Sequence, residues 1–527
     1  MEFRFSIYEF ETIDMESVVF YLQTCYNRVR RVFMEEYILA IDQGTTSTRA
    51  ILFDQHGHLC HMQQREFKQY FPHPGWVEHD AKEIWNSVVE VVQALFTIDN
   101  IQSSQIKAIG ITNQRETTVV WDKTTGEPVY HAIVWQSRQS QDICDELIEK
   151  GYSPMIQEKT GLIINPYFSA SKIKWILDHI DYEHKDQLLF GTIDTWLIWK
   201  LTGGKVHATD YTNASRTMLY NIHDLKWDDD LLALFDIPRS MLPEVKESSC
   251  IYGYSDETQM SGLHFRAPIC GVAGDQQASL FGHTCFQSGD IKNTYGTGCF
   301  ILMNTGHTPV TSNNGLLTTI AWGLHGEITY ALEGSVFIGG SVMQWLRDGL
   351  HLIQNVGETE AMAQSLKNNE GVYLIPAFVG LGTPYWENDV RGTIFGLTRG
   401  TSRNHIVRAA LESIAFQSCD VIEVMKQEAH ISLKSLSVDG GATSNAFLMQ
   451  FQSDMLNIDI LQPQVKETTA LGAAYLAGLA IGFYKSQDDI KKNHQFAQVY
   501  HPVMNQQEAL QYYKQWQKAI AATCVFK

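Results

Sequence analysis

The sequence predicts an α/β protein built from two related halves. Residues 37–54 and 291–303 each contain an apolar, β-branched run, a turn rich in Gly and Thr, and a second apolar run. This pattern is typical of a β-hairpin. The two segments lie far apart in the chain, which suggests that one architecture occurs twice. In residues 435–457 a strand-like run instead leads through two glycines into a helical segment, so strands and helices are mixed.

Composition and charge exclude several classes of protein. The chain has 527 residues, of which 44% are hydrophobic and 19% charged, and this balance is typical of a globular protein. The 40 Lys and Arg against 59 Asp and Glu leave a net charge of −19. Because this charge repels a phosphate backbone, we expect no nucleic-acid partner. No apolar run is long enough to span a membrane, so we expect a cytoplasmic protein that is not embedded in a membrane.

The cysteines exclude two further kinds of scaffold. Nine are spread from Cys25 to Cys524, and none forms a CxxC pair. An odd number without metal-ligand spacing excludes a zinc ribbon and a disulfide framework as the organising feature. Reduced, buried thiols fit this pattern best.

The first 33 residues differ from the rest of the chain. They begin with several acidic residues and have no cleavage site after an apolar run, so we expect no signal peptide. Met34 is followed almost at once by a strand-like run from Tyr37 to Ile41. We expect residues 1–33 to be an N-terminal extension, and hypothesise that translation starts at Met34. The alternative is an appendage that docks on the body of the protein.

The turn of the first hairpin has the composition of an anion site. Gly44 allows a tight turn with exposed N–H groups, and Thr45, Thr46 and Ser47 add hydroxyl donors. Such a turn suits phosphate oxygens, and the carboxylate of Asp42 before it suits a hydrated Mg²⁺. An ordinary polar hairpin is the alternative. The second hairpin of the same kind favours a nucleotide, and the absence of GxxxxGK[ST] excludes a P-loop enzyme.

A strand-to-helix turn in residues 435–457 is the candidate adenosine side of this nucleotide site. The strand Leu436 to Val438 ends in Asp439-Gly440-Gly441, and Ser444 or Asn445 could cap a helix that begins near Ala446. Two glycines at this place let a ligand approach the backbone. A plain turn without a ligand is the alternative.

Two polar segments predict a pocket for a hydroxylated substrate. Arg115 and Glu116 follow the buried strand Ile106 to Thr112, and strand ends in open α/β sheets carry ligands. An adjacent donor and acceptor suit vicinal hydroxyls, although a solvated salt bridge is the alternative. Asp275 and Gln276 precede a helix, where the carboxylate could accept a proton from a hydroxyl or could simply cap the helix. Apolar walls could come from Trp135, Tyr167 and Phe300, for which core packing is the alternative.

Together these segments resemble one family, the FGGY carbohydrate kinases. The resemblance runs from about Tyr37 to Phe483 and includes two long stretches typical of the family, residues 167–179 and 392–412. Its motifs are DQGTT at 42–46, PGWVEHD at 74–80, NQRET at 113–117, NPYFSASKIKWILDH at 165–179, GDQQ at 274–277, NTYGTGCF at 293–300, GTPYW at 382–386 and DGGATSN at 439–445.

The resemblance implies a fold and an activity. The fold is that of the actin-like ATPases, with two ribonuclease-H-like domains and a cleft between them. The first domain, residues 34–282, would bind polyol and phosphate, and the second, residues 283–527, would bind nucleotide. The motifs most closely resemble those of family members that act on glycerol. They imply that ATP phosphorylates glycerol to sn-glycerol 3-phosphate, the first step of glycerol catabolism. We also expect a homodimer or homotetramer.

The resemblance assigns roles residue by residue. It implies that Asp275 is the base, and that Asp42 and Asp275 hold Mg²⁺ through water. Glycerol would contact Arg115, Glu116, Tyr167, Asp275 and Gln276, with Trp135 and Phe300 against its carbon atoms. ATP would contact Thr45, Thr46, Ser47, Arg49 and Thr297 through its phosphates, and Gly340, Gln344, Gly441 and Asn445 through its nucleoside.

One loop departs from the family pattern. Some members bind fructose 1,6-bisphosphate, and others carry a phosphorylatable histidine, in the loop just before GDQQ. Here this loop is QMSGLHFRAPICG, in which His264 stands where a glycine is expected. A side chain at a position of close backbone approach weakens phosphate binding, and the surroundings of His264 differ from the phosphorylated motif. We therefore expect neither form of regulation.

Two alternatives to glycerol phosphorylation stay open. The first is another FGGY kinase that acts on a pentulose or a tetritol, against which the segments PGWVEHD, NQRET and NPYF argue. The second is an ATP-driven switch of the actin or Hsp70 type, which would form no phosphorylated product. The polyol pocket would have no purpose in such a switch.

Overall fold

The first half of the molecule is built on a mixed sheet. The computed structural model describes residues 35–258, 265–387 and 389–526. Within these ranges the strand order of the sheet is β13-β14-β5-β1-β2-β3. The first three strands in sequence form an antiparallel meander, β5 is parallel to β1, and β14 is parallel to β5. The strands are β1 (Tyr37–Gln43), β2 (Ser47–Phe53), β3 (Leu59–Glu66), β5 (Ile106–Asn113), β13 (Ser249–Tyr254) and β14 (Pro268–Gly274).

The second half repeats this arrangement. In its sheet, of order β17-β18-β16-β15-β21-β22-β23, the neighbouring strands β15, β16 and β18 are antiparallel, although β17 precedes β18 in sequence and lies outside it. Strand β21 is parallel to β15, and β22 is parallel to β21. The predicted pair of related halves and both predicted hairpins, β1–β2 and β15–β16, are therefore confirmed. The strands are β15 (Ile291–Tyr295), β16 (Cys299–Gly306), β17 (Leu317–Leu324), β18 (Glu327–Val336), β21 (Ser435–Asp439), β22 (Asp459–Pro463) and β23 (Phe496–Tyr500).

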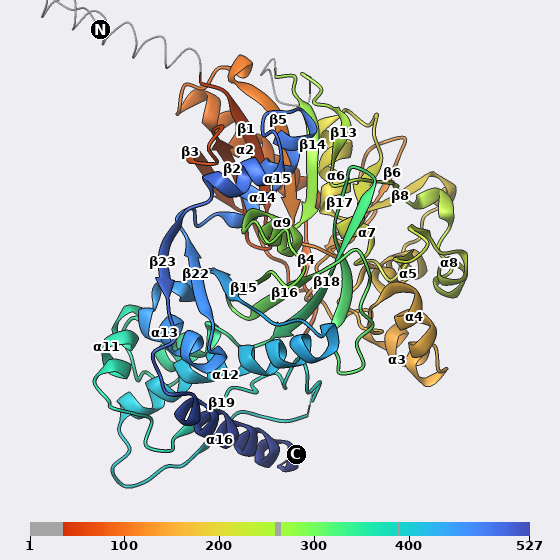
Figure 1. Ribbon diagram of the computed structural model, residues 1–527. Helices are drawn as coiled ribbons and strands as arrows, with labels where there is room; N and C mark the ends of the chain where they lie inside the picture. The colour runs from red at the N-terminus through yellow and green to blue at the C-terminus, as the bar shows by residue number, and fades with distance from the viewer. Residues whose placement is uncertain (1–34, 259–264, 388, 527) are drawn as a thin grey trace, which may run out of the picture.

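Helices cover both faces of the first sheet. Because successive strand residues point to opposite faces, Leu39 and Ile41 of β1 join the core beneath α2 (Ala81–Thr97). Ile38 and Ala40 join the core beneath α14 (Thr468–Ala480) on the other face. Figure 1 shows this blue helix, from the end of the chain, beside the orange strands of the first half. A helix from late in the chain thus completes the core of the first sheet.

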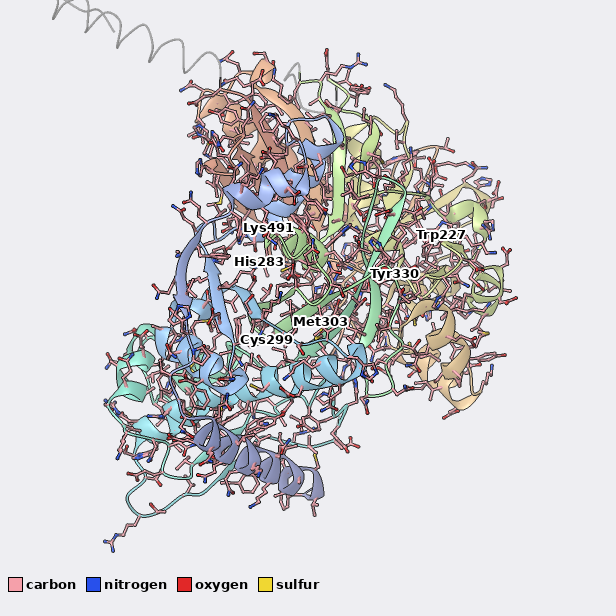
Figure 2. All side chains as sticks on the ribbon, in the orientation of Figure 1. Trp227, His283, Cys299, Met303, Tyr330 and Lys491 are labelled. Atoms are coloured by element: carbon pink, nitrogen blue, oxygen red, sulfur yellow. The ribbon has the colours of Figure 1, made fainter. Side chains whose placement is uncertain are left out.

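The second sheet packs against the longest helix of the described residues, α12 (Arg403–Ala429). The side chains of Cys299 and Met303 on β16 are fully buried in this core, and Figure 2 labels both on the lower sheet. Helix α16 (Gln506–Val525) lies at the bottom of the view in Figure 1 and adds Trp516 to the same core. Helix α9 (Asp275–Gly282) contacts α14 within the core that also contains Ile38 and Ala40.

The remaining elements surround these sheets. The short strands are β4 (Glu78–His79), β6 (Val119–Asp122), β7 (Ala132–Ile133), β8 (Leu188–Gly191), β9 (Ala208–Asp210), β10 (Tyr220–Asn221), β11 (Lys226–Trp227), β12 (Glu244–Lys246), β19 (Tyr373–Ile375) and β20 (Thr393–Phe395). The helices are α3 (Gln141–Glu149), α4 (Ser153–Thr160), α5 (Ser169–His179), α6 (Ile193–Leu201), α7 (Tyr211–Ala214), α8 (Asp229–Phe235), α10 (Ser341–Gln344), α11 (Thr359–Gln364), α13 (Ala446–Leu456) and α15 (Gln487–Asn493).

Two sequence predictions fall outside the described residues. These are the N-terminal extension, residues 1–33, and His264. The structure does describe Arg266, two residues after His264 in the same loop. Its guanidinium lies over the ring of Tyr254, at 5.3 Å from the ring centroid. Among the helices that the structure describes, none combines the length and the apolar character needed to cross a membrane.

Candidate active site

The turn between β1 and β2 presents hydrogen-bond donors, as predicted for an anion site. The N–H of Gly44 donates to the carbonyl of Ser47 at 2.9 Å and closes a tight turn. Thr45 Oγ1 accepts a hydrogen bond from Trp135 Nε1 at 3.0 Å, and Ser47 Oγ accepts one from Gln64 Nε2 at 3.1 Å. Because each hydroxyl oxygen already accepts, its own proton is left to donate. Such a turn fits phosphate oxygens.

Asp42 and Arg49 form an ion pair behind this turn. They are register partners on β1 and β2, and Arg49 Nη1 lies 3.2 Å from Asp42 Oδ2 and 3.3 Å from Glu467 Oε2. Burial raises the pKa of Asp42 to about 6, although Arg49 opposes the shift. A cation beside this carboxylate would favour its ionised form, so Asp42 fits a hydrated Mg²⁺. Thr46 is exposed at the tip of the turn.

The turn between β15 and β16 is bound to the start of α10. The carbonyl of Gly296 accepts from the N–H of Gly340 at 2.8 Å, and the carbonyl of Thr297 accepts from the N–H of Ser341 at 3.2 Å. Thr297 is exposed, as is Gln344 at the far end of the short helix. Three residues predicted to contact ATP from this half therefore lie on two adjoining segments.

The predicted adenosine turn lies against the second hairpin. Gly440 has φ 91°, and a Cβ atom built on it would lie 2.5 Å from the carbonyl oxygen of Tyr295 at the end of β15. Only glycine fits this close approach. By contrast, a Cβ atom placed on the adjacent Gly441 would have no atom of the described residues within 4 Å, apart from its own chain neighbours. The backbone of Gly441 is thus open to a ligand.

Asn445 caps the helix that follows this turn. Its Oδ1 accepts from the N–H of Leu448 at 3.0 Å, so Asn445, and not Ser444, caps α13. Its Nδ2 donates to Thr359 Oγ1 at 3.1 Å. A side chain with these two partners is held rigidly at the edge of the turn.

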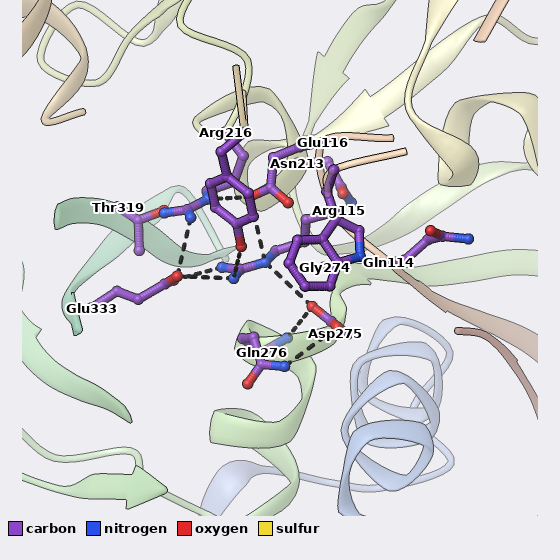
Figure 3. Close-up of polar contacts among 12 residues, drawn as sticks. Gln114, Arg115, Glu116, Asn213, Arg216, Gly274, Asp275, Gln276, Thr319 and Glu333 are labelled. Carbon is purple, nitrogen blue, oxygen red and sulfur yellow. Dashed lines mark hydrogen bonds and ion pairs between the residues drawn. The ribbon is translucent and has the colours of Figure 1, made fainter. Parts of the chain in front are cut away.

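Arg115 is the centre of the predicted polyol pocket. Figure 3 shows its guanidinium held by the carboxylate of Glu333 through Nη1 at 2.6 Å and Nη2 at 2.9 Å. Its Nε lies 3.3 Å from Asp275 Oδ1, and its Nη2 lies 3.4 Å from the hydroxyl of Tyr167. The side chain is 2% exposed, so the alternative of a solvated salt bridge is wrong.

Glu116 lies beside Arg115 in an uncommon backbone conformation. Its φ is 59°, which a residue with a Cβ seldom adopts and which is typical of functional sites. Its carbonyl accepts from Ser169 Oγ at 3.1 Å, and its Oε1 accepts from Arg216 Nε at 2.7 Å. Burial raises the pKa of this carboxyl, against the opposing effect of the two arginines. The second carboxylate oxygen is left to accept from a ligand.

Asp275 is the carboxylate that a substrate can reach. It begins α9, and its side chain is 32% exposed, whereas Glu116 and Glu333 are almost fully buried. Its Oδ1 accepts from the backbone N–H of Gln276 at 2.8 Å, and its Oδ2 from Gln276 Nε2 at 3.3 Å. Burial raises the pKa of Asp275, although Arg115 and Lys292 oppose the shift.

Lys292 fixes the direction of the Gln276 side chain. Its Nζ donates to Gln276 Oε1 and to Thr294 Oγ1, the latter at 2.8 Å. Because an ammonium group can only donate, the amide oxygen of Gln276 faces Lys292 and its NH₂ faces Asp275. Burial lowers the pKa of Lys292 to about 8.

Three aromatic rings lie beside the predicted polyol pocket around Arg115. The ring of Trp135 meets those of Tyr167 and Phe300 edge to face, at centroid distances of 5.6 and 6.3 Å. The rings come from three separate segments, and none of the three is fully buried. They form an apolar wall between the polar pocket and the phosphate turn, since Trp135 also binds Thr45.

The structure therefore assembles all seven residues predicted to contact the polyol, and it adds residues that the sequence analysis missed. Glu333 and Lys292 enter from the second half, and Arg216 places its guanidinium over the rings of Tyr167 and Phe168 at 5.6 and 5.1 Å. A signal for the first two was present, because each is a charged residue inside a strand-like run. The structure shows which residues these charges face.

Comparison with known proteins agrees with this architecture. The N-terminal domain of the FGGY family of carbohydrate kinases matches residues 37–282, and its C-terminal domain matches residues 291–481. The chain is 57% identical to glycerol kinases from Bacillus subtilis and Thermus thermophilus, in each case over 94% of this chain and 100% of the relative. It is also similar to the crystal structure of Plasmodium falciparum glycerol kinase with ADP, at 38% identity and a TM-score of 0.88, covering 93% of this chain and 98% of that one. The chain belongs to the FGGY family of carbohydrate kinases.

Proposed function

We propose that this protein transfers the γ-phosphoryl group of ATP to a primary hydroxyl of glycerol and forms sn-glycerol 3-phosphate. The observation that carries the proposal is the convergence of Arg115, Glu116, Tyr167 and Asp275 beside a turn of anion donors. The high identity to glycerol kinases along almost the whole chain supports the same substrate.

The pocket offers each glycerol hydroxyl a charged or polar partner. In our proposal Arg115 and Tyr167 donate to hydroxyl oxygens, while Glu116 and Asp275 accept their protons. Gln276 completes this set, and Trp135 and Phe300 pack against the carbon atoms. A site of this kind rejects analogues that lack a hydroxyl, because its own polar groups would be left unpaired.

Asp275 acts as the general base in this proposal. A hydroxyl is a poor nucleophile, and a carboxylate within hydrogen-bond reach takes its proton as the new bond to phosphorus forms. The bond between the γ-phosphorus and the bridging oxygen breaks, and ADP leaves with the electron pair. Phosphoryl transfer depends mainly on positioning and on charge stabilisation, which the fixed contacts of Asp275 with Gln276 support.

On the nucleotide side, we propose contacts of two kinds. Thr45, Thr46, Ser47, Arg49 and Thr297 would bind the phosphates, and Gly340, Gln344, Gly441 and Asn445 would bind the nucleoside. Asp42 and Asp275 would hold Mg²⁺ through water molecules. When bound, Mg²⁺ neutralises charge on the phosphate oxygens.

The proposal also covers the domain boundary, the oligomeric state and the cellular location. We place the domain boundary between residues 282 and 283, with the first domain starting at residue 34. We also propose a homodimer or homotetramer in the cytoplasm, and light scattering coupled to size-exclusion chromatography tests the oligomeric state.

The direct test measures ADP release with Mg²⁺ and ATP in the presence of glycerol, dihydroxyacetone, erythritol, xylulose or ribulose. We expect glycerol to give the highest kcat/KM. Faster turnover of erythritol or a pentulose would assign the chain to a sister activity of the family. Release of ADP that no polyol stimulates would contradict the proposal and favour an ATP-driven switch.

A further inference from the structure

Glu333 holds two arginines of the other half of the molecule. It lies on β18 in the second sheet, whereas Arg115 follows β5 of the first sheet and Arg216 follows α7. Its Oε1 accepts from Arg115 Nη2 at 2.9 Å and from Arg216 Nη2 at 3.0 Å, and its Oε2 accepts from Arg115 Nη1 at 2.6 Å. Figure 3 shows both arginines turned toward this carboxylate.

The group is buried, and its charges balance when Glu116, which lies beside both arginines, is counted with Glu333. Glu333 and Arg216 are 0% exposed, and Arg115 is 2% exposed. Removal of one partner would leave a charge in a place that water does not reach. Burial alone would raise the pKa of Glu333, but the two arginines have the larger effect and lower this pKa to about 2. Glu333 therefore stays ionised throughout the pH range in which the protein would work.

The two hydrogen bonds from Arg115 to Glu333 leave only some of the guanidinium N–H groups for other partners. The bonds to Glu333 use protons on both terminal nitrogens. Because the guanidinium is planar and rigid, these two bonds set the direction of its remaining donors. One is Nε, 3.3 Å from Asp275, and another is on Nη2, 3.4 Å from the hydroxyl of Tyr167.

Glu333 also competes with the pocket's own carboxylates for Arg115. Without Glu333, the nearest carboxylates to Arg115 would be Asp275 at 3.3 Å and Glu116 at 3.7 Å. Arg115 would then turn fully toward one of them. In such a pair the carboxylate could no longer accept a proton from a substrate hydroxyl. The N–H groups of Arg115 could no longer donate to a hydroxyl oxygen.

We propose that Glu333 is a positioning residue that fixes Arg115 for polyol binding and keeps it from pairing fully with Asp275. Glu333 itself need not touch the substrate. Because it belongs to the other half, the pocket is complete only when the two halves are in contact. This inference rests on the proposed function, since it concerns the same pocket.

The test compares Glu333→Gln and Glu333→Asp with a matched control, Glu327→Gln. Glu327 lies on the same strand but is exposed, so the control should behave like the wild type. For Glu333→Gln we expect the KM for glycerol to rise at least about tenfold, because a charged hydrogen-bond partner is lost. The KM for ATP should change by less than about twofold, and Glu333→Asp should recover part of the loss because it keeps the charge.

A double-mutant cycle separates positioning from a general structural role. If Glu333 acts through Arg115, Glu333→Gln should add less than about threefold to the glycerol KM of Arg115→Ala. An equal loss in both backgrounds would overturn the proposal, as would an unchanged glycerol KM in Glu333→Gln. If Glu333→Gln does not fold, Glu333→Asp takes its place in the same cycle, with the same criteria.

The experiments distinguish failure of the proposed function from failure of the proposal for Glu333. A wild-type protein that does not phosphorylate glycerol contradicts that function whatever the variants do. The same cycle would then use the polyol that the wild type does phosphorylate, because the contacts of Arg115 with Glu333 do not depend on the substrate.

Discussion

Asp275 differs from the other carboxylates of the pocket in what it can reach. Glu116 and Glu333 are bound by arginines and almost fully buried. Asp275 is one-third exposed, and its contact with an arginine is longer than theirs, at 3.3 Å from Arg115 Nε. Because it is the most exposed of the three and the least tightly bound by arginine, it is the group best suited to accept a proton from a substrate hydroxyl.

We expect Asp275→Asn to lower kcat by about 10²- to 10⁴-fold, because an amide cannot take the hydroxyl proton. The KM for ATP should change much less than kcat, since the phosphate turns and Asp42 are untouched. Steady-state kinetics with both substrates varied checks this expectation. A kcat within about tenfold of the wild type would remove Asp275 as the base.

Trp135 links the polyol pocket to the phosphate turn through its indole N–H. Trp135→Phe keeps an aromatic wall but loses this bond to Thr45, so we expect kcat/KM for ATP to fall about fivefold. The matched control is Trp386→Phe, which loses an indole bond to the carbonyl of Gly315 at 2.8 Å, outside the pocket. Equal kinetics of the two variants would show that the link has no role.

At the scale of elements, the close crossing of α9 and α14 holds Asp275 in place. Asp275 begins α9, and a Cβ atom on Gly472 of α14 would lie 1.8 Å from the carbonyl oxygen of Ala278 in α9. The two helix backbones thus touch without side chains between them. A larger residue would force α9, and Asp275 with it, to move.

Gly472→Ala should therefore destabilise the protein by about 1–3 kcal/mol through overpacking and lower kcat/KM for glycerol. Thermal denaturation and kinetics measure the two effects. The control is Gly400→Ala at an exposed position, where the nearest neighbour of the added Cβ atom would be Thr398 Oγ1 at 3.8 Å. Its stability should stay within about 0.5 kcal/mol of the wild type. A melting temperature unchanged in both variants would contradict the role of this crossing.

The elements themselves were predictable because they depend on local patterns. Apolar, β-branched runs on both sides of a Gly and Thr turn predicted β1–β2 and β15–β16, and polar residues at a strand end predicted the position of Arg115. The partners of Arg115 were not predictable in this way. Glu333 lies 218 positions along the chain from Arg115, so their contact depends on how two whole sheets face each other.

At the scale of the whole molecule, the pocket is shared between the halves. Arg115 and Asp275 belong to the first half, while Glu333, Lys292 and Phe300 belong to the second. The two halves also share a core, because α14 of the second half packs on the first sheet. A ligand in this pocket should therefore stabilise the molecule as a whole.

We expect glycerol and ADP each to raise the melting temperature, since a ligand that binds only the folded state at about 100 times its Kd adds about 2.7 kcal/mol. Differential scanning fluorimetry measures the shift, with xylulose at the same concentration as the control. A shift with xylulose but none with glycerol would contradict the assignment of the pocket.

The most direct test of the central claim is a competition. The protein is mixed with Mg²⁺, limiting ATP, and equal concentrations of glycerol and xylulose, so that the product ratio reports the ratio of the two kcat/KM values. Mass spectrometry and chiral analysis then identify the products. We predict that sn-glycerol 3-phosphate accounts for nearly all of the transferred phosphate. A predominance of phosphorylated xylulose, or ADP formed without an organic phosphate, would contradict the account.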